Sequence, residues 1–129
     1  MTQTRIYLPL SADGIRALAR TGATDEGADP AYAVTAALRA ASPGAGDEEL
    51  EDAALRAAAA GAGVFAVAAA DVDPHDVAEA TEDDPARVAV AGPVPVQRIA
   101  SIHVVDGADI LWYDVTELAE VDRLAARAP

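Results

Sequence analysis

The sequence contains no cysteine, no lysine and no asparagine, and the first two absences each remove a class of chemistry. Without cysteine the chain has no thiol nucleophile, disulfide, zinc finger or iron–sulfur ligand set. Without lysine it has no P-loop lysine, Schiff base or lysine general base, and arginine supplies all 9 basic residues. These absences, together with abundant alanine, glycine and proline, are typical of a GC-rich bacterial genome.

Large side chains are also scarce. Aromatic residues make up 4% of the chain, and about half of the 52% that is hydrophobic is alanine. The core is therefore expected to be thin, with helices lying close to a sheet. At 129 residues the chain is long enough for one core and too short for two, which predicts a single domain over residues 1–129.

Long apolar runs are absent. Residues 1–6 lack the basic start and apolar stretch of a signal peptide, and no apolar segment approaches the roughly 18 residues that a membrane span needs. The expected location is the cytoplasm.

Basic residues are fewer than acidic ones, and the formal net charge is −13. The acidic residues concentrate in the middle of the chain, where they keep an alanine-rich surface soluble. Because such a surface repels phosphate backbones and anionic lipids, neither nucleic acid nor a membrane surface is expected as a partner.

Hydrophobic patterns predict five to six strands. Residues 5–10 alternate with period 2, with Pro9 placing that strand at an edge or ending its pairing, and residues 64–70 and 87–91 are continuous apolar runs. The Asp-Gly pair at 106–107 is typical of a hairpin joining strands 101–105 and 110–113. Residues 31–41 fit either one helix or a strand over 32–34 followed by a helix capped by Thr35, and the second interpretation is preferred.

Helices are predicted over 12–20, where Ser11 is the cap, over 47–60, and over 115–126, where Leu118, Val121 and Leu124 share one face. Asp114 and Glu117 have the spacing of a capping box at the start of that last helix. Shorter helical turns fit 76–80 and 96–100, and residues 21–30 read as a loop. The predicted fold is α+β, with one mixed, largely antiparallel sheet of about five to six strands and two to three helices packed on it.

Six segments in order resemble an uncharacterised family of small actinobacterial proteins, known only as a domain of unknown function. They are RIYLPL at 5–10, YAVTAALRAA at 32–41, DEELEDAAL at 47–55, VAAADV at 67–72, PVPVQRIASIHVVD at 93–106 and ILWYDVTEL at 110–118. The resemblance covers more than half of the chain and implies a cytoplasmic protein with no established activity. The family's longer acidic insertion before LWY is reduced here to residues 107–109, so any site built on that insertion would be missing.

One acidic segment has the composition of a metal site. Asp71, Asp73, His75 and Asp76 follow an apolar strand within six residues, and hard divalent cations prefer such oxygen-rich sets. The alternative is a solvated, turn-forming loop, which is the more common role of such a sequence.

The second group of candidates comes from the predicted hairpin. His103 lies between Ile102 and Val104, so it faces the opposite side of its strand and fits a ligand or general base near Asp114. Trp112 and Tyr113 point to opposite faces, so at least one of them packs in the core and the other is available for a partner. Trp112 is predicted to be the core anchor, and its replacement by alanine to unfold the domain.

No serine lies in a nucleophile elbow and no glycine-rich phosphate loop is present, so the sequence predicts no catalytic residue and requires no cofactor. The favoured hypothesis is a non-enzymatic domain that binds a protein partner or forms a homodimer. One alternative is a divalent-metal protein or metal-dependent hydrolase using Asp71, Asp73, His75 and Asp76. The other is a small-molecule pocket near His103 and Trp112.

Overall fold

The computed structural model describes residues 2–24 and 30–128. Its strands are β1 (Thr4–Leu10), β2 (Ala31–Ala33), β3 (Ala66–Val72), β4 (Val77–Glu79), β5 (Arg87–Val90), β6 (Ile99–Asp106) and β7 (Asp109–Asp114). Its helices are α1 (Ala12–Thr21), α2 (Ala36–Ala41), α3 (Asp47–Ala59) and α4 (Leu118–Ala126), with 3-10 turns at η1 (Pro74–Asp76), η2 (Val96–Arg98) and η3 (Val115–Glu117).

The seven strands form one sheet in the order β4-β5-β2-β1-β3-β6-β7, and every neighbouring pair is antiparallel. The prediction of an α+β fold is confirmed. The described residues contain seven strands and four α-helices, more than the five to six and two to three predicted, and the sheet is antiparallel rather than mixed. Strand direction depends on the path of each connection, which a local hydrophobic pattern does not encode.

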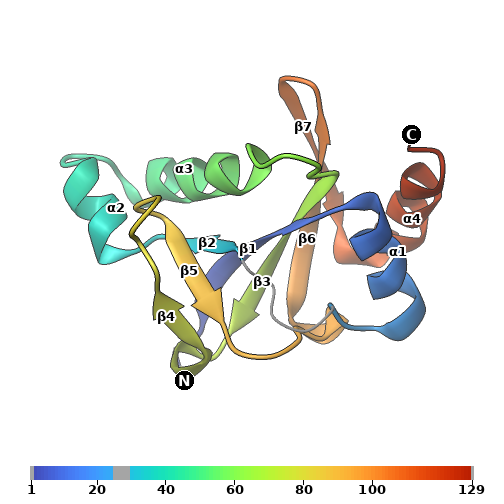
Figure 1. Ribbon diagram of the computed structural model, residues 1–129, viewed down its shortest axis with the longest axis horizontal. Helices are drawn as coiled ribbons and strands as arrows, with labels where there is room; N and C mark the ends of the chain where they lie inside the picture. Colours follow the sequence, from blue (N-terminus) through green and yellow to red (C-terminus); the bar gives the residue numbers. More distant parts are fainter. Residues whose placement is uncertain (1, 25–29, 129) are drawn as a thin grey trace.

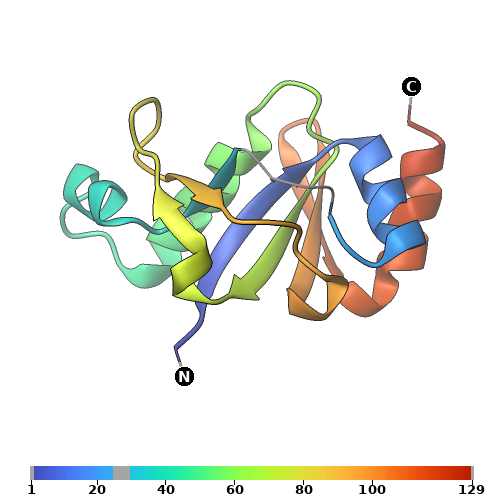
Figure 2. The same cartoon turned by 60° about the horizontal axis from the view of Figure 1, so that its bottom comes forward.

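Helices cover the two faces of the sheet in pairs (Figures 1 and 2). On one face α1 and α4 lie side by side, and Ile15, Leu18 and Val121 pack against sheet residues that include Ile6 and Ile102. On the other face Leu38 of α2 and Leu50 of α3 pack against Tyr7 and Val67. Strands β1 and β3 contribute alternate residues to both cores, as the period of 2 requires.

Sequence signals placed the ends of the helices correctly. Ser11 accepts a hydrogen bond from the Gly14 amide at 3.0 Å, and α1 ends at Gly22, whose φ of 82° is the left-handed conformation that favours glycine. Thr35 accepts from the Leu38 amide at 2.9 Å, so the preferred strand-then-helix interpretation of 31–41 is confirmed. The predicted loop over 21–30 lies in part outside the described residues.

The segment between β3 and β5 was wrongly predicted. In place of a helical turn over 76–80 the chain forms η1 and then β4, which pairs Val77 with Val90 at an edge of the sheet. Only Val77 of this strand is partly buried, so β4 has no apolar alternation that could have revealed it. Pro9 is not at the sheet edge, since it pairs with Val67, but pairing between β1 and β2 ends before it.

The final helix also differs in its buried face. Val121 and Ala125 are buried in α4, whereas Leu118 and Leu124 are only partly buried. No helix within 2–24 or 30–128 is long and apolar enough to cross a bilayer.

Candidate functional site

One part of the sheet surface carries most of the predicted interaction residues. In the β6–β7 hairpin Ser101 pairs with Asp114 and His103 pairs with Trp112, so these four side chains share one face, here called the open face. The same face carries Val67 and Ala69 of β3, which pair with His103 and Ser101. Helix α3 lies over β2, β1 and β3 on this face.

Helix α3 reaches the hairpin only with its C-terminal end. There Ala59 and Ala60 line a hollow of about 190 Å³ together with Val105 and Ile110. The hairpin projects beyond this end of the helix (Figure 1). The residues lining the hollow do not include His103 or Trp112, so a small-molecule pocket beside these two side chains stays a prediction.

Trp112 is 62% exposed, which makes the prediction of a core anchor wrong. Tyr113 has the role assigned to Trp112: it pairs with the buried Ile102 and packs against the core under α1 and α4. The register of the hairpin decides between them. Gly107 and Ala108 form a two-residue turn that pairs Asp106 with Asp109, and every later pair follows from that closure.

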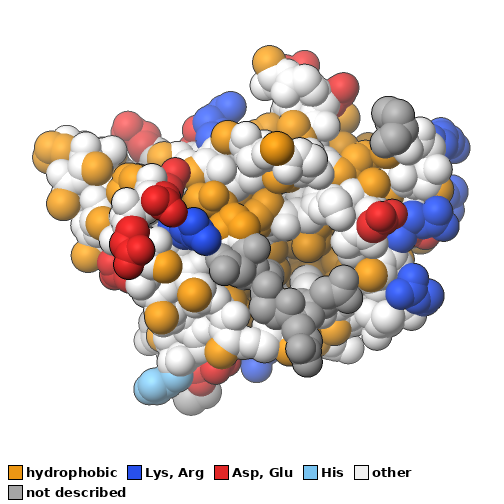
Figure 3. Space-filling model, viewed as in Figure 1, with side chains coloured by type: hydrophobic (Ala, Val, Ile, Leu, Met, Phe, Trp, Pro, Cys, Tyr) orange, Lys and Arg blue, Asp and Glu red, His pale blue; other side chains and the backbone are white. Residues whose placement is uncertain are grey.

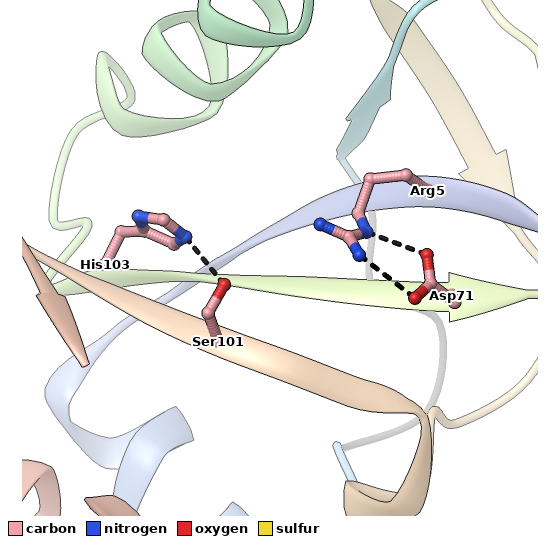
Figure 4. Close-up of polar contacts among 4 residues, drawn as sticks. All are labelled: Arg5, Asp71, Ser101 and His103. Carbon is pink, nitrogen blue, oxygen red and sulfur yellow. Dashed lines mark hydrogen bonds and ion pairs between the residues drawn. The ribbon is translucent and has the colours of Figure 1, made fainter. Parts of the chain in front are cut away.

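His103 faces away from the buried Ile102 and Val104, as the alternation predicted. Its Nε2 and the Ser101 hydroxyl are hydrogen-bonded at 2.9 Å (Figure 4). Burial lowers the pKa of His103, and the Arg5 guanidinium lowers it further. The predicted partner Asp114 is used elsewhere, because its carboxylate accepts hydrogen bonds from the Thr116 amide and hydroxyl.

A second polar pair borders the open face. Arg5 of β1 donates to both carboxylate oxygens of Asp71 on β3, at 2.7 Å from Nε and 3.0 Å from Nη2 (Figure 4). Next to it lies the largely buried Tyr7, whose pKa is raised by burial and by the nearby Glu51 carboxylate. The bidentate geometry holds the Arg5 guanidinium against Asp71.

The structure brings the predicted metal ligands together only in part. Asp71 is occupied by Arg5, whereas Asp73 accepts from the His75 amide at 2.9 Å and caps η1. The His75 ring nitrogen Nδ1 is hydrogen-bonded to the same Asp73 carboxylate at 2.9 Å, although the His75 side chain is 95% exposed. Asp76 lies in η1 and lines one hollow together with Asp73 and Arg98. Among the residues described, no group of three or more His, Asp or Glu side chains is arranged to hold a metal ion. Metal binding by this segment stays a prediction.

The Ser101–His103 pair is built into the sheet. Ser101 is 7% exposed, and its backbone lies between β3 and β7, with pairing on both sides. The Ser101 backbone is therefore engaged in the sheet, whereas an oxyanion hole is formed by donors that are free to face the substrate. In contrast, an exposed indole beside an imidazole is well suited to binding another molecule.

Sequence reasoning missed two residues of this region. Arg5 could have been found, because the alternation of residues 5–10 places it on the same face as Tyr7. Leu111, which is 43% exposed, could not, because its exposure follows from the position of β7 at the end of the strand order.

Comparison with known proteins identifies a family for this chain. No curated protein and no solved structure matches the chain. A model for a family of unknown function, DUF6912, matches residues 4–109, from the start of β1 to the start of β7. The expected resemblance to an uncharacterised family is confirmed at this level, although residues 110–118 lie beyond the match. Because the match covers well over half of its length, the chain belongs to the DUF6912 family.

Proposed function

We propose that this protein is a non-enzymatic interaction domain that binds a protein partner through the exposed aromatic strand β7. The observation that carries the proposal is the 62% exposure of Trp112, the only tryptophan of the chain. Tryptophan is among the residues most enriched at the energetic centres of interfaces, because one side chain buries a large area at a low cost in conformational entropy.

The surroundings of Trp112 support the same proposal. Leu111 is also exposed, and the two are the large hydrophobic residues most open to solvent in the described chain. His103 and Ser101 provide a polar margin beside the indole, and interfaces commonly combine an apolar centre with such a rim. We further propose that the protein acts in the cytoplasm and is of actinobacterial type.

Site-specific photo-cross-linking in living cells tests this function. A benzophenone amino acid replaces Trp112 in one variant and Glu79 in a matched control, because Glu79 lies on β4 at the other edge of the sheet and is also exposed. The expected result is a discrete adduct of higher mass from position 112 that is absent from position 79.

The mass of the adduct, identified by mass spectrometry, distinguishes a homodimer from a complex with another protein. If position 112 gives no adduct, or if both positions give the same set of adducts, then β7 is not a specific interaction surface and the proposed function is wrong.

A further inference from the structure

The two exposed hydrophobic residues of β7 lie on opposite faces of the sheet. Leu111 pairs with the buried Val104, and Trp112 pairs with His103 on the open face. A partner docked on either face would cover only one of them. A strand added beside β7 brings neighbours to both, because successive side chains of a strand alternate between faces.

The position of β7 permits such an addition. It is the last strand of the sheet and pairs on one side, with β6. The Asp114 amide donates to the Glu117 carboxylate at 3.2 Å rather than to β6, so this amide points to the outer side of the strand. By the alternation of an antiparallel ladder, the amides of Ile110 and Trp112 point the same way. They are the donors that an added strand would use.

The charge of the edge indicates which segments it accepts. Residues 99–122 contain no arginine, and carboxylates stand at both ends of β7. Hydrogen bonds from Thr116 lower the pKa of Asp114, which keeps that carboxylate charged. Arg56, which lines the neighbouring hollow, is paired with Asp52 of its own helix. The acidic residues near the edge are Asp106, Asp109, Asp114 and Glu117.

Building on the function proposed above, we infer that β7 binds an extended segment of another protein as an eighth strand, and that this segment has an apolar centre flanked by basic residues. The apolar centre covers Ile110, Leu111 and Trp112, and the basic residues lie near Asp109 and Asp114. A second copy of this chain is the less favourable occupant, because pairing β7 with itself brings eight carboxylates together between two molecules that each carry a net charge of −13.

Selection from a displayed library of random ten-residue peptides tests this inference on the intact chain, with counter-selection on the Trp112→Ala variant. The expected peptides have arginine or lysine on both sides of a β-branched or aromatic centre. Their binding is followed by the fluorescence of Trp112, which shifts to shorter wavelength as the indole leaves water. Affinity is expected to fall about tenfold in Trp112→Ala, measured by calorimetry, and to decrease with added salt.

Charge and backbone variants separate strand addition from other modes of binding. Asp109→Arg is expected to weaken a selected basic peptide about fivefold and to favour a peptide with glutamate at its ends, whereas Glu79→Arg on β4 leaves both affinities unchanged. Binding should also protect the Ile110 and Trp112 amides from hydrogen exchange.

Three results would overturn the inference. The first is that no peptide binds the parent chain better than it binds Trp112→Ala, and the second is that the enriched peptides carry no basic residues. The third is that the chain sediments as a dimer and the fluorescence of Trp112 shows the indole to be already buried in it. If cross-linking at position 112 succeeds while the library gives none of the expected peptides, the proposed function stands. The inference that β7 binds a segment with basic flanks as an added strand is then wrong. If cross-linking at 112 also fails, both are wrong.

Discussion

At the scale of single residues, Tyr113 and Trp112 are neighbours in β7 that differ in their surroundings. Tyr113 packs against the core under α1 and α4, while Trp112 points to the open face and is 62% exposed. The stability of the fold should therefore depend little on Trp112, although it is the largest side chain present.

We expect Trp112→Ala to lower the free energy of unfolding by no more than about 2 kcal/mol, because most of this side chain stays in water on folding. Ile102→Ala, the matched core variant on the partner strand, should cost roughly 2–5 kcal/mol, because Ile102 is 0% exposed. Urea unfolding followed by circular dichroism measures both. An unfolded Trp112→Ala protein would restore the core-anchor interpretation.

His103 makes stability depend on pH in a defined direction. Burial and Arg5 lower its pKa in the folded state, so between the folded and unfolded pKa values the unfolded chain binds more protons. Its contribution is fully present above the unfolded pKa of about 6.5 and is lost as the pH falls through that value toward the folded pKa. We expect Tm to fall between pH 7.5 and pH 5.5, and to fall less in His103→Gln.

Calorimetric scans at these two pH values make the comparison, and the imidazole resonance of His103 in an NMR titration gives its pKa directly. A pKa above about 6.5 would contradict the predicted sign. His103→Gln keeps a hydrogen-bonding group beside Ser101, which limits the effect of the substitution itself.

At the scale of elements, the start of the last helix depends on one capping box. Asp114 accepts from the Thr116 amide at 2.9 Å, and Glu117 accepts from the Asp114 amide at 3.2 Å. These bonds hold the turn from β7 into η3 and α4, and therefore the packing of Val121 against the core. The capping box therefore joins β7 to α4, the helix that packs on the sheet face opposite the open face.

Asp114→Ala should cost about 1 kcal/mol of stability and reduce the helical signal of α4, because two first-turn groups lose their partner. Asp114→Ser should retain most of the cap, since a serine hydroxyl also accepts from the helix amides. Urea denaturation of the two variants beside the parent chain measures the difference, and equal stability of all three would show that the box contributes nothing.

At the scale of the whole molecule, two cores share the central strands. Ile6 and Leu8 of β1 face α1 and α4, whereas Tyr7 between them faces α2 and α3. Alanines of β3 are buried on both faces, and their small size lets helices approach the sheet from both sides. On the face seen in Figure 3, several basic side chains gather at the end formed by α1 and α4, while others lie over α3 and, beside acidic side chains, over β5.

Because β1 and β3 belong to both cores, we expect one cooperative unfolding transition, which is also the test of the single-domain prediction. Leu18→Ala in one core and Leu50→Ala in the other should each cost roughly 2–5 kcal/mol and shift the same transition, since both side chains are almost fully buried. Scanning calorimetry with both variants is the measurement. Two separate transitions, each moved by only one variant, would contradict it.

The sequence by itself determined the helix starts and the hairpin turn, because each depends on residues that are close together in the chain. Ser11, Thr35 and Asp114 cap their helices because a side-chain oxygen satisfies amides two or three residues away, and the Gly107 turn closes its hairpin for an equally local reason. The face of His103 was also predictable, since alternation in a strand needs no knowledge of the sheet.

Tertiary structure alone decided strand order, the extra edge strand β4 and the exposure of Trp112. Burial depends on what lies beside a strand, and the position of β7 at the end of the sheet is fixed by pairings between residues as far apart as Arg5 and Asp71, or Val67 and His103. The pattern of residues 110–113 is the same for a central strand as for an edge strand. Only the assembled sheet places β6 on one side of β7 and solvent beside Trp112, which is the arrangement on which the proposed partner surface rests.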